Sequence, residues 1–377
     1  HRQKNPSALT RPNRTVLHGE LQQRAHETRL SSKTMKIWIL DPYHAGSHAD
    51  WASGIQSVLL QAGHLVTLHT LPGRHWKWRM HAAAAHFASL MEDAEAPDVV
   101  LTTDMCDVAQ LQGLMPSSWN RVRTVTMFHE NQLTFPWSPT DSDVATGRDQ
   151  TYAYLNLSSA LASDQVWFNS EHHRTAFLSA AQAWMKRMPK PHIPELAERI
   201  GAKSQVMHLG LDFTGWDDLK PPASSIEPTA SPVILWNHRW SWDKGADAFV
   251  GFVDDILEAE VPASFVILGK GFERRPEGWD AMKDKLGNRC LQWGYADSRD
   301  DYVRWLWRSD VAPVHPKQEY FGLSIVEAMR CEVIPWVPNA HAYPETTPEH
   351  HPYLEDRDWL GALQKKQWVE WPLSKEA

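Results

Sequence analysis

The segment Ser309-Asp-Val-Ala-Pro-Val-His315 is followed after three residues by Glu319-Tyr-Phe-Gly-Leu-Ser-Ile-Val-Glu327. The first part has the apolar character of a buried strand, and the second passes through a glycine turn into a helix. Free backbone N–H groups at the start of that helix, together with its dipole, favour an anion at this point. Glu319 lies just before the turn, where its carboxylate can accept hydrogen bonds from sugar hydroxyls. Glu327 lies two helical turns later, within reach of a ribose diol. The competing interpretation of Glu327 is a helix-surface carboxylate paired with Arg330, three residues later.

A second segment, Asn237-His-Arg239-Trp-Ser-Trp-Asp-Lys244, places two cations at the end of another predicted strand. Breaking a sugar–phosphate bond leaves negative charge on a diphosphate, and cations already in place stabilise that charge. Arginine offers phosphate a bidentate fork, whereas lysine acts as a point charge. Either cation alone would be interpreted as a solvated surface group, but with the paired glutamates we interpret the set as a nucleotide-sugar site. The predicted donor-binding residues from the two segments are Asn237, Phe321, Gly322, Leu323, Ser324 and Glu327.

Strand-like and helix-like segments alternate along the whole chain. The predicted strands are Lys36–Asp41, Leu65–Thr70, Asp98–Thr103, Arg123–Phe128, Gln165–Asn169, Gln205–Leu209, Val233–Asn237, Ser264–Gly269, Cys290–Trp293, Val311–His315 and Val333–Val337. The predicted helices include Ala49–Gln61, Arg79–Met91, Gln150–Ala162, Glu171–Met185, Lys244–Ala259 and Asp300–Arg308. This alternation predicts parallel sheets covered by helices on both faces. The expected fold class is therefore α/β, with two doubly wound, Rossmann-like domains facing a cleft.

Composition divides the chain into four regions. Residues 1–34 lack hydrophobic periodicity and contain seven Lys/Arg against two Asp/Glu, so we expect a leader or disordered extension, with a basic RNA-binding arm as the alternative. The segment from Lys220 to Pro232 has four prolines and no periodicity, as a linker would. We therefore expect a first domain at 35–222, a second domain at 223–355 and a helical tail at 356–377.

Charge and cysteine content exclude several classes of protein. The net charge is −8 for the whole chain and more negative without the basic extension, which argues against nonspecific coating of nucleic acid. The sequence has no apolar stretch long enough to span a bilayer, so we expect no membrane partner. Three widely spaced cysteines favour a reducing cytosol. An RNA substrate would need a local basic patch, for which the candidates are Arg74, Lys77, Arg79, Arg121, Arg123, Lys186, Arg187, Lys190, Arg199 and Lys203.

Polar motifs also follow predicted strands in the first half. His44-Ala-Gly46-Ser47-His48 joins the first strand to the first helix, and Gly46 allows close approach of a phosphate or an acceptor. The pattern Gly-x-Gly-x-x-Gly is absent, which argues against a dehydrogenase. His129-Glu130-Asn131-Gln132 lies at the carboxyl end of a strand, where ligand crevices open. A single strand-end histidine is usually structural, but four consecutive polar residues favour a functional loop.

The segment Arg74-His-Trp76-Lys77-Trp78-Arg79 predicts a cationic aromatic loop. Bases of single-stranded RNA stack on tryptophan while arginine and lysine contact phosphates. The chain has 20 tryptophans, so simple packing of Trp76 and Trp78 is the competing interpretation.

The order Arg239, Lys244, Glu319, Glu327 resembles the second half of retaining GT-B glycosyltransferases. Four further segments resemble the tRNA-queuosine α-mannosyltransferase family: Phe128–Leu133, Leu71–Arg79, Ala45–His48 and Trp293–Tyr295. The match extends from about Met35 to about Glu345. The resemblance implies a GT-B fold, a tail that can return across the first domain, and transfer of mannose from GDP-mannose to the queuosine wobble nucleoside of tRNA.

The resemblance also implies roles for individual residues. Catalysis is expected from Arg239, Lys244, Glu319 and His129. Gly46, Ser47, Gly294 and Tyr295 are expected to bind the donor, with the nucleobase near Tyr295. The acceptor is expected to contact His44, Arg74, Trp76, Lys77, Trp78, Arg79, Glu130, Asn131 and Gln132. No metal and no cofactor is expected, because charge stabilisation comes from the two cations, and the sequence indicates no particular oligomeric state.

Two alternatives stay open from the residues themselves. The same donor chemistry could serve a lipid or polysaccharide acceptor, or another hexose, and the segment Ala181–Met188 is the candidate amphipathic helix for a membrane surface. A catalytically silent nucleotide- or RNA-binding protein is the other alternative. It is disfavoured because both phosphate cations and both glutamates are present.

Overall fold

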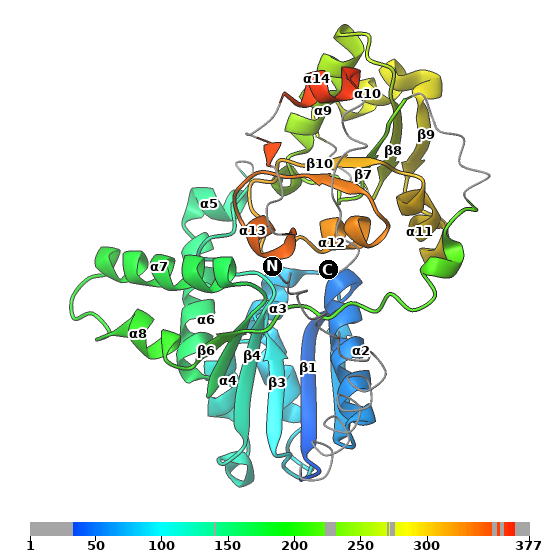
Figure 1. Ribbon diagram of the computed structural model, residues 1–377. Helices are drawn as coiled ribbons and strands as arrows, with labels where there is room; N and C mark the ends of the chain where they lie inside the picture. The colour runs from blue at the N-terminus through cyan, green and yellow to red at the C-terminus, as the bar shows by residue number, and fades with distance from the viewer. Residues whose placement is uncertain are drawn as a thin grey trace, which may run out of the picture.

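The computed structural model describes residues 33–138, 141–222, 231–269, 271, 276–348, 353–354 and 358–365. In this part the chain forms two separate parallel sheets, each in its own domain, with helices packed against them (Figure 1). The predicted α/β class with two doubly wound domains is confirmed. The predicted extension at 1–34 falls almost wholly outside the described residues, as does most of the predicted linker.

The first sheet has the order β2-β1-β3-β4-β5-β6 and all its strand pairs are parallel. Its strands are β1 (Lys36–His44), β2 (Leu65–Pro72), β3 (Val99–Thr103), β4 (Arg123–Phe128), β5 (Gln165–Phe168) and β6 (Ser204–Val206). The chain first moves from β1 to β2 and then returns to the other side of β1 to form β3. Loops leaving β1 and β3 therefore diverge, and such a switch point is where parallel sheets open a ligand crevice.

The second sheet has the order β11-β10-β7-β8-β9 and is likewise parallel. Its strands are β7 (Val233–Trp236), β8 (Ser264–Leu268), β9 (Cys290–Gly294), β10 (Val311–Pro313) and β11 (Ile334–Trp336). Its switch point lies between β7 and β10. The two segments quoted first from the sequence follow these two strands, so the topology brings them together.

Several helices begin where a local side chain satisfies a free backbone N–H group. Ser170 accepts a hydrogen bond from the His173 backbone N–H at the start of α7 (Glu171–Arg187), and Ser298 accepts one from the Asp301 backbone N–H at the start of α11 (Arg299–Trp307). The longer helices are α2 (Gly46–Gln61), α3 (Trp76–Ser89), α6 (Asp149–Ala162), α7 (Glu171–Arg187), α9 (Ala246–Glu258) and α11 (Arg299–Trp307). The shorter ones are α4 (Val108–Leu114), α5 (Ser142–Thr146), α8 (Leu196–Gly201), α10 (Trp279–Leu286), α12 (Leu323–Arg330), α13 (Tyr343–Thr346) and α14 (Trp359–Gln364).

All eleven predicted strands are confirmed to within a few residues, and so are the helices that we predicted. Short helices such as α4, α8 and α10 were not predicted, because six to eight residues show little periodicity. The described part of the tail, α14, packs on the second domain: the Trp359 and Phe252 rings have centroids 4.3 Å apart, and Leu363 is buried in the core around Trp236. This differs from the expected return across the first domain, and residues 366–377 lie outside the described part. Among the described residues, no helix is both long and apolar enough to cross a bilayer.

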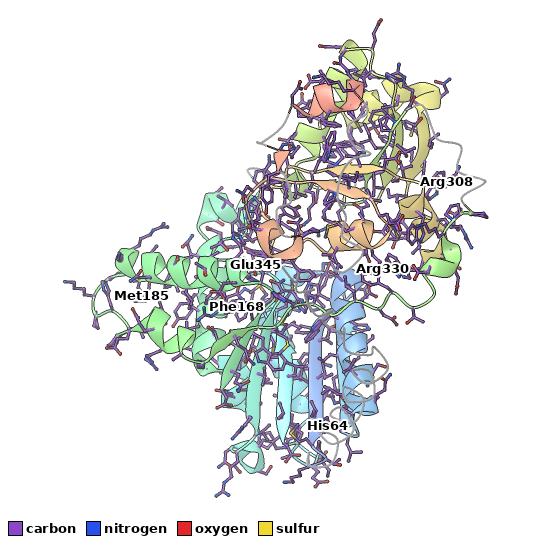
Figure 2. The ribbon with its side chains drawn as sticks, in the orientation of Figure 1. His64, Phe168, Met185, Arg308, Arg330 and Glu345 are labelled. Atoms are coloured by element: carbon purple, nitrogen blue, oxygen red, sulfur yellow. The ribbon has the colours of Figure 1, made fainter. Side chains whose placement is uncertain are left out.

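The two domains contact each other through the loops at the carboxyl ends of their sheets. Elements α12 and α13 of the second domain face the ends of the first domain's strands (Figure 1). Glu345 lies at this junction (Figure 2), where its carboxylate accepts hydrogen bonds from the backbone N–H groups of Glu171 and His172 at 2.7 and 2.6 Å. A second-domain carboxylate thus caps the first turn of α7 in the first domain.

Candidate active site

The loops after β7 and β10 approach each other very closely at the switch point of the second sheet. Gly245 has φ = +70°, and a Cβ atom at this position would lie 1.9 Å from the His315 carbonyl oxygen. Only glycine fits this space and this backbone conformation. The sequence thereby fixes Lys244, the preceding residue, against the loop that contains Glu319.

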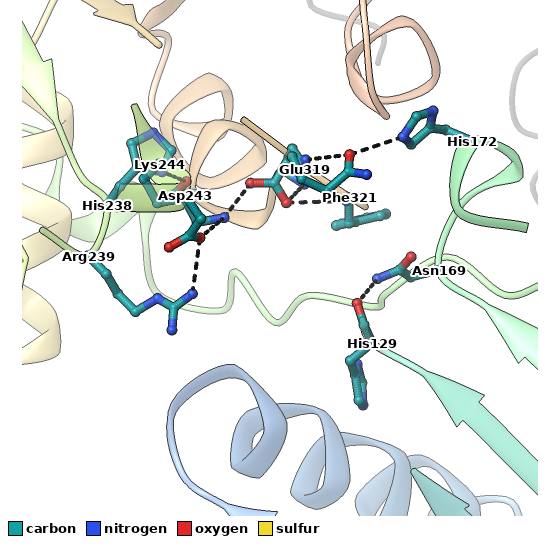
Figure 3. Close-up of polar contacts among 12 residues, drawn as sticks. His129, Asn169, His172, His238, Arg239, Asp243, Lys244, Glu319 and Phe321 are labelled. Carbon is teal, nitrogen blue, oxygen red and sulfur yellow. Dashed lines mark hydrogen bonds and ion pairs between the residues drawn. The ribbon is translucent and has the colours of Figure 1, made fainter. Parts of the chain in front are cut away.

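Lys244 and Glu319 form an ion pair at the centre of this site, with 2.8 Å between Nζ and Oε2 (Figure 3). The other carboxylate oxygen of Glu319 accepts a hydrogen bond from the Gly322 backbone N–H at 3.0 Å, just before α12. Burial alone would raise the pKa of Glu319, but Lys244 and these hydrogen bonds outweigh it and lower the pKa to about 2. The Glu319 carboxylate is therefore ionised at neutral pH.

Arg239 is the more exposed of the two cations at this site, and Lys244 is the more buried one. Its guanidinium lies 3.5 Å from a carboxylate oxygen of Asp243, and its side chain is 55% exposed. Asp243 also lies 3.9 Å from Lys244, so one carboxylate faces both cations. The geometry leaves most of the Arg239 fork open to an anionic ligand.

Glu327 is buried on α12 and has two partners from α11. The Arg299 guanidinium lies 2.5 Å from Oε1 and the Tyr302 hydroxyl donates to Oε2 at 2.6 Å. The competing surface interpretation of Glu327, an ion pair with Arg330, is wrong, because Arg330 binds the exposed Asp217 at 2.7 Å. The fold thus holds this carboxylate rigidly, although its predicted ribose contact stays a prediction.

The remaining predicted donor residues of the second domain lie at the same end of its sheet. The Asn237 amide donates to the Tyr302 hydroxyl and to the Ser324 carbonyl oxygen. Gly322, with φ = +84°, caps the start of α12, so that Leu323 and Ser324 form its first turn. Phe321 is buried, whereas Gly294 ends β9 and Tyr295, the next residue, is 75% exposed.

The loop after β1 faces this site from the first domain. Gly46 has φ = +52° and begins α2, which has no side-chain cap and no acidic residue in its first turn. Ser47 follows it on the surface, and the His44 ring is bonded to the buried Asp41 at 2.7 Å. The free N–H groups at the start of α2 therefore have no acidic side chain in their own first turn, and His48 of this turn lies near enough to Arg239 for that cation to lower its pKa.

His129 lies beside this helix start, packed edge-on against His48 and Trp51 with ring centroids 4.6 and 4.7 Å apart. Its carbonyl oxygen accepts a hydrogen bond from Asn169 at 2.9 Å (Figure 3). Burial lowers the pKa of His129 well below its usual value, and the neighbouring His48 and His173 add to this effect. The imidazole is neutral at physiological pH, and its Nε2 has no hydrogen-bond partner among the described residues.

Glu130 and Asp104 are neighbouring carboxyl groups on the first-domain side of the site. The Asp104 carboxylate accepts a hydrogen bond from the His129 backbone N–H at 2.9 Å, which fixes the start of this loop. Burial, together with Glu130, raises the pKa of Asp104 well above its usual value. Burial also raises the pKa of Glu130, although Arg239 and Lys244 of the other domain oppose it. Glu130 therefore faces the donor cations across the cleft.

Asn131 and Gln132 have largely structural contacts. The Asn131 side chain accepts hydrogen bonds from the backbone N–H groups of Leu133 and Thr134, both at 3.0 Å, and so closes a tight turn. The Gln132 amide donates to Glu130 at 3.1 Å. These two residues shape the loop that presents His129 and Glu130.

The predicted cationic aromatic loop is only partly a loop, because α3 begins at Trp76. Trp76 packs on Tyr152 with ring centroids 5.2 Å apart, and Lys77 is paired with Asp141 and Asp143 at 2.7 and 2.6 Å. Lys77 is thus already neutralised.

Three side chains of this segment, one aromatic and two cationic, remain at least partly accessible. The Trp78 side chain is 65% exposed. Arg79 donates to the Pro72 carbonyl oxygen at 3.3 Å, and Arg74 is on the surface. The exposed part of the predicted acceptor segment is therefore smaller than the sequence indicated.

Several site residues were missed from the sequence. Asp104 directly follows β3, which pairs with β4, so the strand-end signal used for His129 could have identified it. Arg299 and Tyr302 are separated from Glu327 by 28 and 25 residues, and no local pattern relates them. The described residues contain no group of three His, Cys, Asp or Glu side chains that could hold a metal ion.

Both halves of the chain match known families. Residues 36–211 match the family model described as tRNA-queuosine alpha-mannosyltransferase N-terminal, and residues 220–352 match the model described as glycosyl transferases group 1. The tRNA-queuosine alpha-mannosyltransferase of Drosophila melanogaster is 29% identical over 321 residues, which cover 84% of this chain and 83% of that protein.

Solved structures share the two-domain architecture at low sequence identity. Sucrose-phosphate synthase from Thermosynechococcus elongatus has a TM-score of 0.61 at 14% identity, covering 89% of this chain and 90% of its own. Anabaena HepE in complex with UDP and glucose has a TM-score of 0.54 at 16% identity, covering 89% and 91%. These structures have the GT-B fold, which the predicted architecture matches.

Proposed function

Because the chain belongs to the tRNA-queuosine α-mannosyltransferase family and is a glycosyltransferase, we propose that it transfers mannose from GDP-mannose to queuosine in tRNA. The observation that supports this most directly is the Lys244–Glu319 pair, with Arg239 beside it, at the switch point of the second sheet. The uncapped start of α2 and the His129 loop face it from the first domain.

The second domain would bind the donor. Arg239, Lys244 and the helix start at Gly322 would lie around the diphosphate, Glu319 would accept hydrogen bonds from mannose hydroxyls, and Glu327 would hold the ribose. As the bond from the anomeric carbon to the phosphate oxygen breaks, charge grows on GDP. The two cations are already in place, so they stabilise that charge without reorganisation.

The first domain would position the acceptor. A queuosine hydroxyl oxygen forms its bond to the anomeric carbon on the face that GDP leaves, and its proton passes to the departing phosphate oxygen, so the configuration is retained. His129 is neutral and can hydrogen-bond the sugar, while Glu130 can orient the attacking hydroxyl. Such a step depends on positioning and charge stabilisation more than on a strong base.

The proposal includes no metal and no cofactor, because Arg239 and Lys244 supply positive charge at the diphosphate. It also includes a cytosolic location, since tRNA is the acceptor. Trp78 and Arg79 would contact the anticodon loop through stacking and phosphate binding.

The test mixes purified protein with queuosine-containing tRNA and a panel of nucleotide sugars in the presence of EDTA, followed by mass spectrometry of the digested nucleosides. A gain of one hexose on queuosine with GDP-mannose alone is the expected result. Transfer from another donor would replace the sugar in the proposal. Donor binding without any transfer would direct the search to another acceptor.

A further inference from the structure

Tyr320, next to Glu319 in the sequence, extends from the second domain into the first. Its side chain is only 5% exposed. The hydroxyl lies 2.8 Å from Thr134 Oγ1 and donates to the Asn131 carbonyl oxygen at 3.4 Å. The ring stacks on His173 with centroids 4.0 Å apart and an interplanar angle of 26°. A single side chain therefore touches two elements of the acceptor-side domain.

Both contacted residues, Thr134 and His173, are connected to residues of the proposed site. Thr134 belongs to the turn that the Asn131 side chain closes, directly after His129 and Glu130. His173 is bonded to Asn169 at 2.8 Å, and Asn169 donates to the His129 carbonyl oxygen at 2.9 Å. At the other end, Glu319 is the covalent neighbour of Tyr320. A continuous set of contacts thus joins the donor carboxylate to the His129 loop.

Separate contacts nearby hold the domains together. The Glu345 carboxylate caps α7 through Glu171 and His172, and Gln318 faces the His172 ring at 3.3 Å. Docking of the domains therefore does not depend on the Tyr320 hydroxyl. Phenylalanine at this position would retain the stacked ring but would lose the hydrogen bonds to the acceptor-side loop.

We propose that Tyr320 is a positioning residue that couples the placement of Glu319 to that of the Asn131–Thr134 turn, so that donor and acceptor are aligned together. The proposal rests on the glycosyltransferase function above. Because the aligned geometry matters most in the reacting complex, losing the hydroxyl lowers the transfer rate more than it weakens donor binding.

The test compares Tyr320→Phe with Tyr343→Phe. Tyr343 is fully buried in the second domain beside Gly322, and its hydroxyl has no hydrogen-bond partner among the described residues. Tyr343→Phe is therefore a matched control for Tyr320→Phe, because each variant loses one buried phenol oxygen near Glu319. Thr134→Val and the double variant Tyr320→Phe/Thr134→Val complete a double-mutant cycle. The readouts are GDP-mannose affinity by calorimetry, single-turnover mannose transfer, slow donor hydrolysis without tRNA, and amide hydrogen exchange.

For Tyr320→Phe we expect about a tenfold loss of transfer and hydrolysis rates, donor Kd within about twofold of wild type, and faster amide exchange in residues 131–134. The double variant should be no slower than the slower single variant, and Tyr343→Phe should behave as wild type. Three results would overturn the proposal. They are rate losses of the two single variants that multiply in the double variant, unchanged amide exchange of residues 131–134 in Tyr320→Phe, or a rate loss in Tyr343→Phe as large as that in Tyr320→Phe. If wild type transfers nothing to queuosine, the proposed function fails, while hydrolysis and exchange still decide the role of Tyr320.

Discussion

The buried carboxyl groups on the two sides of the cleft differ in charge state: the donor side favours the ionised form and the acceptor side the neutral form. On the donor side, Lys244 lowers the pKa of the buried Glu319 to about 2 against the effect of burial, so this carboxylate is ionised. On the acceptor side, burial raises the pKa of Asp104 and Glu130 and lowers that of His129 and His48, which favours the neutral forms. The difference arises because Lys244 outweighs the effect of burial on Glu319, whereas burial is the largest cause of every shift on the acceptor side and is not outweighed there.

This contrast matches the chemistry that each side would perform. A diphosphate leaving group needs fixed charge, and the donor side provides it. An attacking hydroxyl is neutral, and neutral hydrogen-bonding groups can orient it without binding it too tightly. One fold therefore builds two electrostatically different surfaces through the choice of neighbours around each buried group.

Removing the donor-side cation is expected to have the largest effect. Lys244→Ala leaves Glu319 buried without its partner and removes charge stabilisation from the leaving group, so kcat should fall by about 10³ or more, equivalent to about 4 kcal/mol. Steady-state kinetics and tRNA filter binding would check this, with tRNA affinity nearly unchanged. Lys317→Ala is the control, because Lys317 pairs with the exposed Asp247 at 2.9 Å. Equal losses in both variants would contradict a special role for Lys244.

The acceptor-side and donor-side histidines predict a specific acid sensitivity. Burial lowers the pKa of His48 to about 4 and that of His238 to about 3, from 6.5. The unfolded chain therefore takes up these protons first as the pH falls. The contribution of the two neutral histidines to the free energy of unfolding is fully present above pH 6.5 and is lost progressively as the pH falls below this value. Each histidine contributes a slope of about 1.4 kcal/mol per pH unit, which the raised pKa values of Asp104 and Glu130 oppose.

Urea unfolding at pH 7, 6 and 5 measures this slope. In His48→Gln the slope between pH 6 and 5 should be shallower by about one proton, because glutamine does not titrate. An unchanged slope would mean that His48 is not held in its neutral form by the fold.

Much of this architecture could be predicted from sequence because the strands are short apolar runs bounded by turn residues. The position of Lys244 against Glu319 was also predictable in outline, since both follow strands and parallel strands end at one edge. The partners of Glu327, by contrast, could not be predicted from the sequence. Arg330 lies three residues away on the same helix and looks like its partner, but the helix turns Arg330 toward Asp217 and Glu327 inward toward α11. Only tertiary packing decides between two arginines.

Lys77 illustrates the same limit on the acceptor side. From sequence it belongs to a cationic aromatic stretch with Trp78 and Arg79. In the structure it pairs with two aspartates more than sixty residues later, Asp141 and Asp143. Long-range pairing therefore removes one cation from the surface and leaves its neighbours there.

The accessible tryptophan should have an intermediate effect confined to the acceptor. Trp78→Ala is expected to weaken tRNA binding by about 5- to 30-fold, equivalent to about 1–2 kcal/mol of lost stacking, with GDP-mannose affinity unchanged. Electrophoretic mobility shift measures the first and calorimetry the second. Trp78→Phe is the matched control and should retain most of the tRNA affinity. A fall in donor affinity would show that the two sides of the cleft are not separate.

The smallest effect is expected from Arg330→Ala. Its partner Asp217 has a 71% exposed side chain, and such surface pairs stabilise proteins by about 1 kcal/mol or less. Arg299→Ala is the matched variant. It removes the guanidinium from Glu327, whose side chain is only 7% exposed, and should reduce the free energy of unfolding by about 3 kcal/mol. Urea unfolding of the two variants side by side compares them directly. Equal destabilisation would mean that Glu327 does not depend on α11, and the rigid placement of this carboxylate at the donor site would have to be abandoned.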